Sequence, residues 1–154
     1  MTSYKVPRAV VDSFCEAYAV RDVTRVADFL HDEVQWTVNG PADFLPFSGT
    51  WRGKPVVLDL IGRRVPAVLR ILNFVPYSCL VDGDQLAMLN RQTAQRTDDG
   101  RVISFRVANF MRFHNDKIVH NLSLLDSFDA VEQVIGHPLA VHEHAKSDGD
   151  LVAI

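Results

Sequence analysis

The apolar residues near the N-terminus recur at the spacing of an amphipathic helix. Val10, Val11, Phe14 and Tyr18 would form one apolar stripe, and Pro7 suits the first position of such a helix. We therefore expect the chain to open with a helix that buries one face.

A second helix, a strand and a third helix are predicted before residue 70. Asp22 stands directly before apolar residues at helical spacing, residues 34–39 alternate like a strand, and Pro55 precedes another apolar stripe. The segment 42–53 between the strand and the third helix carries aromatic side chains among loop residues. Loops of this kind often cover a binding pocket, so the segment is a candidate pocket wall.

From residue 70 onward the apolar period changes to two, which is typical of β-strands. Turn-forming pairs separate four alternating stretches, which span residues 70–81, 85–97, 101–114 and 117–126. A short helix from about Ser127 to Ile135 follows and ends at Gly136. Helices first and hairpins afterwards predict an α+β domain, in which helices cover one face of a curved antiparallel sheet and the concave face holds a pocket.

Single polar side chains fall on strand faces that are otherwise apolar. The alternation puts Arg91 and Thr93 on the apolar face of the second stretch, Asn109 on that of the third, and His120 and Asp126 on that of the fourth. An unpaired buried charge costs several kcal/mol, so such groups must pair or line a cavity. We therefore expect these five residues to line one pocket.

Composition and charge fit an ordinary globular protein. The 154 residues suit one domain, and a net charge of −3 gives no electrostatic case for nucleic acid binding. The N-terminal stretch is interrupted by charges, so neither a signal peptide nor a membrane span is expected. Cys15 and Cys79 lack CxxC spacing and are expected to be buried thiols in a reducing compartment, which makes a cytoplasmic location the expectation.

A metal ion is not expected in the C-terminal part of the chain. His137, His142, Glu143 and His144 stand in a polar stretch where no regular element fixes them as ligands. We therefore predict neither a metal site nor a cofactor.

The order of elements resembles the SnoaL-like, nuclear transport factor 2-like superfamily. The segments that carry this resemblance are Leu30-His31-Asp32-Glu33-Val34-Gln35-Trp36, Phe110-Met111-Arg112-Phe113, Lys117-Ile118-Val119 and Leu125-Asp126. The resemblance covers residues 7–136 as a single domain and leaves 137–154 as a tail. It implies a cone-shaped, cystatin-like α+β barrel, in which the sheet wraps around the N-terminal helices, and a homodimer through the outer face of the sheet.

Two enzyme groups of this superfamily match the chain only in part. Where ketosteroid isomerases carry the general base and the two groups of the oxyanion hole, this chain has Val38, Phe14 and Asn109, so the base is lost. Epoxide hydrolases resembling limonene epoxide hydrolase carry an Arg-x-Asp pair and a second aspartate before the C-terminal helix. Here Arg91 and Asp126 match, while Thr93 replaces the acid, so epoxide hydrolysis is disfavoured.

SnoaL-type polyketide cyclases resemble the chain at Asp126, and this gives the first functional hypothesis. Asp126 would be the base that removes a proton from an acidic carbon, Arg91 would orient it, and Asn109 with His120 would stabilise the developing enolate. The ligand would be a small hydrophobic carbonyl or oxygenated compound. The residues expected to contact it are Phe14, Tyr18, Trp36, Val38, Phe47, Trp51, Thr93 and Val107.

The same residues also have structural interpretations, and these give the alternative. Asp126 stands at capping-box spacing before the last helix, Arg91 could be its counter-ion, and His120 could be a hydrogen-bonded core histidine. The chain would then be a non-catalytic module that binds a ligand or dimerises.

Overall fold

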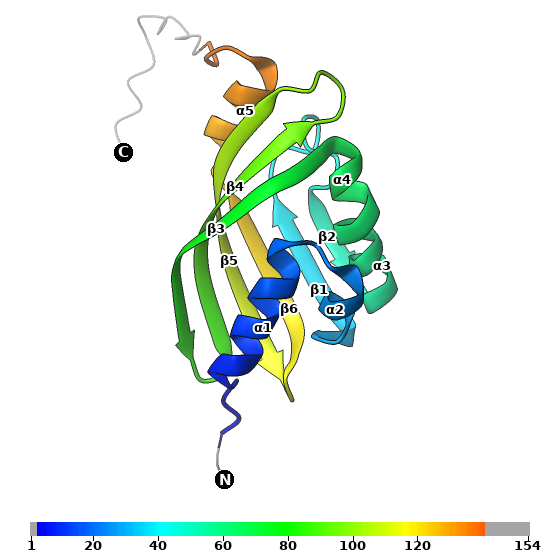
Figure 1. Cartoon of the computed structure of the whole chain (residues 1–154), viewed down its shortest axis with the longest axis vertical. Coiled ribbons are helices and arrows are strands. Elements are labelled where there is room, and N and C mark those ends of the chain that lie inside the picture. The colour runs from blue at the N-terminus through cyan, green and yellow to red at the C-terminus, as the bar shows by residue number, and fades with distance from the viewer. Residues whose placement is uncertain (1–2, 141–154) are drawn as a thin grey trace, which may run out of the picture.

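The computed structural model describes residues 3–140, which form a curved six-stranded sheet with helices on its concave side (Figure 1). The helical segments are α1 (Arg8–Ala19), α2 (Val23–Ala27), α3 (Lys54–Asp59), the π-helical turn η1 (Leu60–Arg64), α4 (Val65–Val68) and α5 (Ser127–Ile135). The strands are β1 (Leu30–Asn39), β2 (Gly49–Arg52), β3 (Leu69–Asp82), β4 (Gln85–Arg96), β5 (Val102–His114) and β6 (Lys117–Leu125). The predicted α+β fold is confirmed, and no helix among these residues is long and apolar enough to cross a bilayer.

The sheet order is β2-β1-β6-β5-β4-β3, so β3 to β6 form the predicted antiparallel meander. Only the junction of β1 with β6 is parallel, and it joins the first strand to the last. The predicted turns lie between the strands: Gly83 and Gly100 have positive φ, and Asn115 and Asp116 have φ of 46° and 62°. Positive φ at both central residues is the hairpin geometry whose twist matches that of the strands.

Helix α1 packs its apolar stripe on the inner face of the sheet. Val11 and Phe14 are fully buried, and Phe14 stacks on Tyr18 at a ring distance of 5.5 Å. Cys15 contacts Met88 of β4, and its burial raises the pKa of its thiol to about 11. This thiol therefore stays protonated at neutral pH and is a poor nucleophile.

The alternation of β4 is the reverse of the one predicted. Asn90 and Gln92 are buried, whereas Arg91 and Thr93 lie on the outer face, opposite Arg106 and Ser104 of β5. Both faces of this strand begin with apolar residues, because the outer face is itself apolar in this region. Hydrophobicity alone therefore cannot orient β4, and the prediction that Arg91 and Thr93 face the core is wrong.

A bulge in β6 reverses the side chains of its second half. Arg112 of β5 pairs with His120 and Phe113 pairs with Ile118, so Val119 is an extra residue in β6. Ile118 faces the core before the bulge, and Asn121 and Ser123 face the core after it. His120 is thereby turned to the outer side, opposite the exposed Arg112, and the prediction that it faces the core is wrong.

Asp126 also lies outside the core, which corrects the prediction for this residue. Its carboxylate accepts a hydrogen bond from the exposed Arg106 at 2.9 Å, and its side chain is 32% exposed. Asp126 occupies the N-cap position of α5, but its side chain forms no capping hydrogen bond. The capping-box interpretation therefore places Asp126 correctly at the N-cap, but the side-chain hydrogen bond that it predicts is not formed.

Candidate functional site

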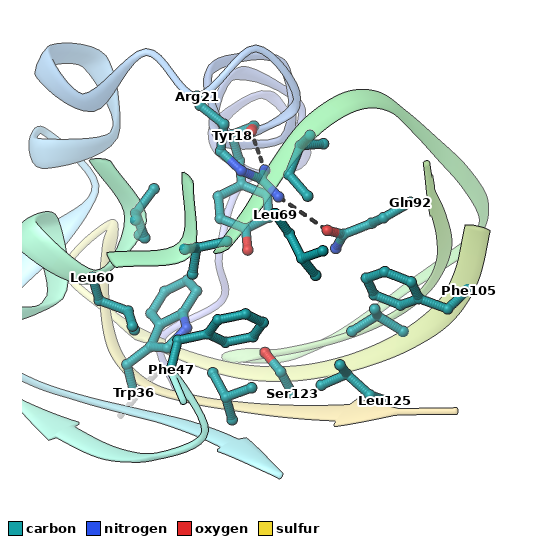
Figure 2. A pocket seen from close by; sticks show the side chains of 15 residues that line it. Tyr18, Arg21, Trp36, Phe47, Leu60, Leu69, Gln92, Phe105, Ser123 and Leu125 are labelled. Carbon is teal, nitrogen blue, oxygen red and sulfur yellow. Dashed lines mark hydrogen bonds between the residues drawn. The ribbon is translucent and has the colours of Figure 1, made fainter. Parts of the chain in front are cut away.

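The candidate site is a pocket between the C-terminal end of α1, the segment from η1 to β3, strand β1 and the inner faces of β4 to β6 (Figure 2). Its walls are mostly apolar, and they include Trp36, Val38, Phe47, Leu69, Phe105 and Val107. The cavity volume is about 50 Å³. An apolar cavity that holds benzene measures roughly 150 Å³. A ring-sized ligand must therefore displace side chains of the pocket wall.

Arg21 is the only residue with a formal charge among the described residues that line this pocket. Its guanidinium lies over the ring of Tyr18, with 3.9 Å from the carbon Cζ to the ring centroid. It donates hydrogen bonds to the backbone oxygen of Tyr18 and, at 3.1 Å, to Oε1 of Gln92. Figure 2 shows the guanidinium between Tyr18 and Gln92, at one end of the apolar pocket.

A chain of hydrogen bonds runs from Arg21 across the inner face of the sheet, and Arg21 fixes its direction. Arginine can only donate, so Gln92 must present its oxygen to Arg21 and its Nε2 to Oδ1 of Asn90, at 3.1 Å. Nδ2 of Asn90 then donates to Oδ1 of Asn109 at 2.8 Å. Each amide thus accepts from the side nearer Arg21 and donates away from it.

The chain of hydrogen bonds ends at Ser123, which lines the pocket. Ser123 Oγ accepts from Nδ2 of Asn109 at 2.8 Å and from Nδ2 of Asn121 at 2.9 Å. A hydroxyl oxygen has two lone pairs, so these bonds leave the Ser123 group only its proton to offer. Figure 2 shows the Ser123 oxygen directed into the pocket, where the proton is available to a ligand.

Two further polar groups face the pocket. Within the part of the chain that the structure describes, neither the Tyr18 hydroxyl nor the Trp36 indole N–H forms a hydrogen bond, and both side chains belong to the lining. The described lining contains no Asp, Glu or His. The described lining of the pocket therefore presents hydrogen-bond donors and one positive charge, and it presents no carboxylate or imidazole to act as a general base.

Part of the predicted site lies where it was expected. Tyr18, Trp36, Val38, Phe47 and Val107 line the pocket. Three other predicted residues are near it without lining it. Phe14 is fully buried behind Tyr18, Asn109 lies beneath Ser123 in the hydrogen-bond chain, and Trp51 is half-buried with its ring 4.8 Å from the guanidinium carbon of Arg64.

The other four predicted site residues form contacts away from the pocket. Arg91 donates to the Tyr77 hydroxyl at 2.9 Å, and Thr93 contacts Ser104 on the same outer face. His120 and Asp126 lie opposite or beside arginines of β5, as described above. The structure therefore does not bring Arg91, Asp126 and Asn109 together. Among the described residues, which include His137, no cluster of metal-ligating side chains is found. His142, Glu143 and His144 lie outside the described residues.

Sequence reasoning missed Arg21, Asn90, Gln92, Asn121 and Ser123. The missed signal is a pair of polar residues at strand spacing, Asn90 with Gln92 and Asn121 with Ser123, on two strands next to the one that carries Asn109. Buried amides require partners, and neighbouring amides can supply them to each other. Charge drew attention to Arg91 and Asp126 instead.

Comparison with known proteins shows what the chain is similar to. The model of the SnoaL-like domain matches residues 11–121. A candidate isomerase from Rhodopseudomonas palustris is 30% identical, with a TM-score of 0.74 over 83% of this chain and 97% of that protein. No protein of curated function matches the chain.

Two more distant structures show the fold alone. An NTF2-like protein of unknown function from Burkholderia pseudomallei K96243 is 22% identical, with a TM-score of 0.73 over 83% of this chain and 95% of that one. An LEH-like epoxide hydrolase of M. tuberculosis is 16% identical, with a TM-score of 0.66 over 83% of this chain and 88% of that one.

Proposed function

Because the chain belongs to the family of SnoaL-like domains, we propose that it binds a compact, mostly apolar small molecule with hydrogen-bond acceptors in the pocket beneath α1. The observation that carries this proposal is the combination of apolar walls with several polar groups that can donate hydrogen bonds into the pocket. The Tyr18 hydroxyl and the Trp36 N–H face the cavity between apolar walls, where a hydrogen bond to a ligand is stronger than one to bulk water. A ligand that supplies acceptors gains these bonds, and its apolar body gains from burial.

Filling the pocket is expected to abolish ligand binding. Val107→Phe places a larger side chain on the inner face of β5, where the free volume is about 50 Å³. We expect wild type to show raised melting temperatures with members of a panel of cyclic ketones, lactones and small aromatic carbonyl compounds, because a ligand that binds only the folded state stabilises it. Val107→Phe should lose those shifts.

The matched control is Val102→Phe, which makes the same change on the outer face of the same strand. Val102 is 58% exposed, so this variant should keep the wild-type shifts. Equal shifts in Val107→Phe and wild type would contradict binding in this pocket. Absence of any shift in wild type across the panel would contradict the proposed ligand class.

Proton-transfer catalysis is a second candidate function, and the donors at Ser123 and Tyr18 favour it. Donors aimed at a developing enolate oxygen stabilise it, which suffices for a substrate whose carbon is already acidic. The earlier hypothesis of Asp126 as the base receives no support from its ion pair with Arg106 on the outer side of the sheet. In the mechanism proposed here, solvent or a basic group of the substrate accepts the proton that leaves the acidic carbon.

This second function is tested on any 1,3-dicarbonyl compound that the panel identifies as a ligand, by following deuterium exchange at its acidic carbon. We expect Ser123→Ala to lower the catalysed rate per folded molecule roughly a hundredfold, since it removes one stabilising donor. Asp126→Asn and the outer-face variant Ser104→Ala should leave the rate near that of wild type. A large loss in Asp126→Asn would instead restore the carboxylate as the base.

We also propose that the chain forms a homodimer through the outer face of the sheet. Cross-strand neighbours there form two apolar rows, which run through Ala87, Phe110 and Leu122 and through Leu89, Ala108 and Leu124. Phe110 is 48% exposed, and Leu80 beside Ala87 on β3 is 67% exposed. We call these residues the outer-face patch. Contiguous exposed apolar surface of this kind is typical of an interface.

A further inference from the structure

We infer that the ligand of this pocket is an organic anion, a compact carboxylic acid whose carboxylate pairs with Arg21. The inference rests on the proposed function, because it names the chemical class of the molecule that fills the same pocket. It starts from the charge of the pocket. Arg21 is half-buried and lines the cavity, and it forms no ion pair with any carboxylate in residues 3–140.

The unused hydrogen-bonding capacity of Arg21 matches a carboxylate. Two of its five N–H groups donate to neutral oxygens, those of Tyr18 and Gln92, so three remain. A guanidinium binds the two oxygens of a carboxylate side by side, with geometry that a neutral carbonyl cannot reproduce. The apolar surroundings strengthen such a pair, because little water screens it.

The backbone at Arg21 gives an independent reason to assign it a binding role. The amide of Arg21 donates to the oxygen of Tyr18 and that of Asp22 donates to the oxygen of Ala17, which is the Schellman arrangement at the end of a helix. Arg21 occupies the left-handed position of this motif, with φ of 55°, where glycine is usual. A side chain at such a position is strained, and retained strain is characteristic of functional sites.

The strained turn also fixes where the guanidinium lies. From this position the side chain turns back over the end of α1, onto the ring of Tyr18 and toward Gln92. Figure 2 shows it held between these two groups at the end of the pocket. Because the guanidinium is already held in place, a ligand anion meets it with little further loss of side-chain freedom.

The hydrogen-bond chain supports an anion at the other polar groups of the pocket as well. Since Arg21 orients every amide from Gln92 to Asn109, it also determines that Ser123 faces the ligand as a donor. With the Tyr18 hydroxyl and the Trp36 N–H, the pocket offers donors around Arg21, and no carboxylate stands among its lining residues in the described part of the chain. An acid with a small ring or branched chain fits this arrangement.

The test compares acids with their neutral amides of the same shape. The probes are benzoate with benzamide, and cyclohexanecarboxylate with its amide, titrated by calorimetry into the full-length protein at neutral pH. We expect each acid to bind wild type roughly tenfold tighter or more than its amide, which is the effect of one charge-assisted hydrogen-bond pair. Arg21→Gln should bring the affinities for acid and amide to within roughly twofold of each other.

Two further variants keep the result interpretable. Arg21→Gly relieves the left-handed strain, so its melting temperature without ligand should not fall below that of Arg21→Gln, and it should also lose the preference for acids. Arg25→Gln removes a nearby exposed arginine that pairs with Glu16, and it should keep the wild-type preference. This control separates binding at Arg21 from a general effect of positive charge.

The outcomes distinguish this inference from the proposed function. Equal affinity of wild type for an acid and its amide would overturn the anion inference while leaving the pocket as a binding site. Binding of neutral panel compounds without any binding of the acids would have the same meaning. A preference for acids that survives in Arg21→Gln and Arg21→Gly would place the anion elsewhere and overturn the assignment of Arg21.

Discussion

Asn109→Leu is expected to lower the free energy of unfolding by about 3 kcal/mol, although leucine has the same side-chain branching and is apolar. Asn109 is 1% exposed and is the middle of the hydrogen-bond chain. Without it, Nδ2 of Asn90 loses its acceptor and Ser123 loses one of its two donors. Each buried polar group left unpaired costs roughly 1–3 kcal/mol, and two such groups outweigh the gain from placing an apolar side chain at this buried position.

Urea unfolding measures this loss. The slope of the free energy of unfolding against urea concentration should stay unchanged, which indicates that the folded and unfolded states keep their compactness. The control is Asn39→Leu, at the exposed end of β1, which should change the stability by less than about 0.5 kcal/mol. A stability of Asn109→Leu equal to that of wild type would mean that the amide chain contributes nothing to the fold. Its arrangement would then have to be explained by the ligand alone.

Phe110→Asp is expected to turn a dimer into a monomer. A twofold interface contains each residue twice, so the substitution places two carboxylates among the apolar side chains of the outer-face patch. Truncating one central aromatic residue commonly costs 2 kcal/mol or more, and an unpaired charge adds its desolvation. We therefore expect the dissociation constant to rise by roughly a thousandfold or more.

Light scattering on a size-exclusion column gives the mass directly. Wild type should run at twice the monomer mass of 17.3 kDa at micromolar concentration, and Phe110→Asp should run at 17.3 kDa. Val20→Asp is the control, since Val20 is 71% exposed at the C-cap of α1, on a different part of the surface, and should remain dimeric. A wild type of 17.3 kDa would contradict the homodimer.

Part of the pocket lining could be predicted from the spacing of apolar residues in α1 and β1. Helix α1 buries the stripe predicted for it, and Tyr18 lies at the pocket because it shares that stripe with Phe14. Trp36 and Val38 follow from a strand whose inner face is apolar and whose outer face is polar. In these elements the solvent-exposed side is polar, so the pattern has only one interpretation.

The orientation of β4 and of the second half of β6 could not be predicted in this way. In β4 the apolar outer face competes with the inner face, and in β6 one extra residue at Val119 exchanges the two faces. A shift of one residue moves a whole strand's side chains to the opposite side of a sheet. For this reason Arg91, His120 and Asp126 were assigned to the pocket, and Gln92 and Ser123 were not.

The sequence by itself determined the α+β fold, the four-stranded meander with its turns and the main helices, because period, turn residues and helix ends are local properties of the chain. It did not show strand β2 (Gly49–Arg52), which lies in the segment 42–53 that was predicted as a loop. The tertiary structure decided which polar residues meet. Arg21, Gln92 and Ser123 come from a helix end and two strands, and their contact depends on strand register and on a strained turn. Such contacts arise only when distant segments pack together, so a pattern along the chain cannot show them.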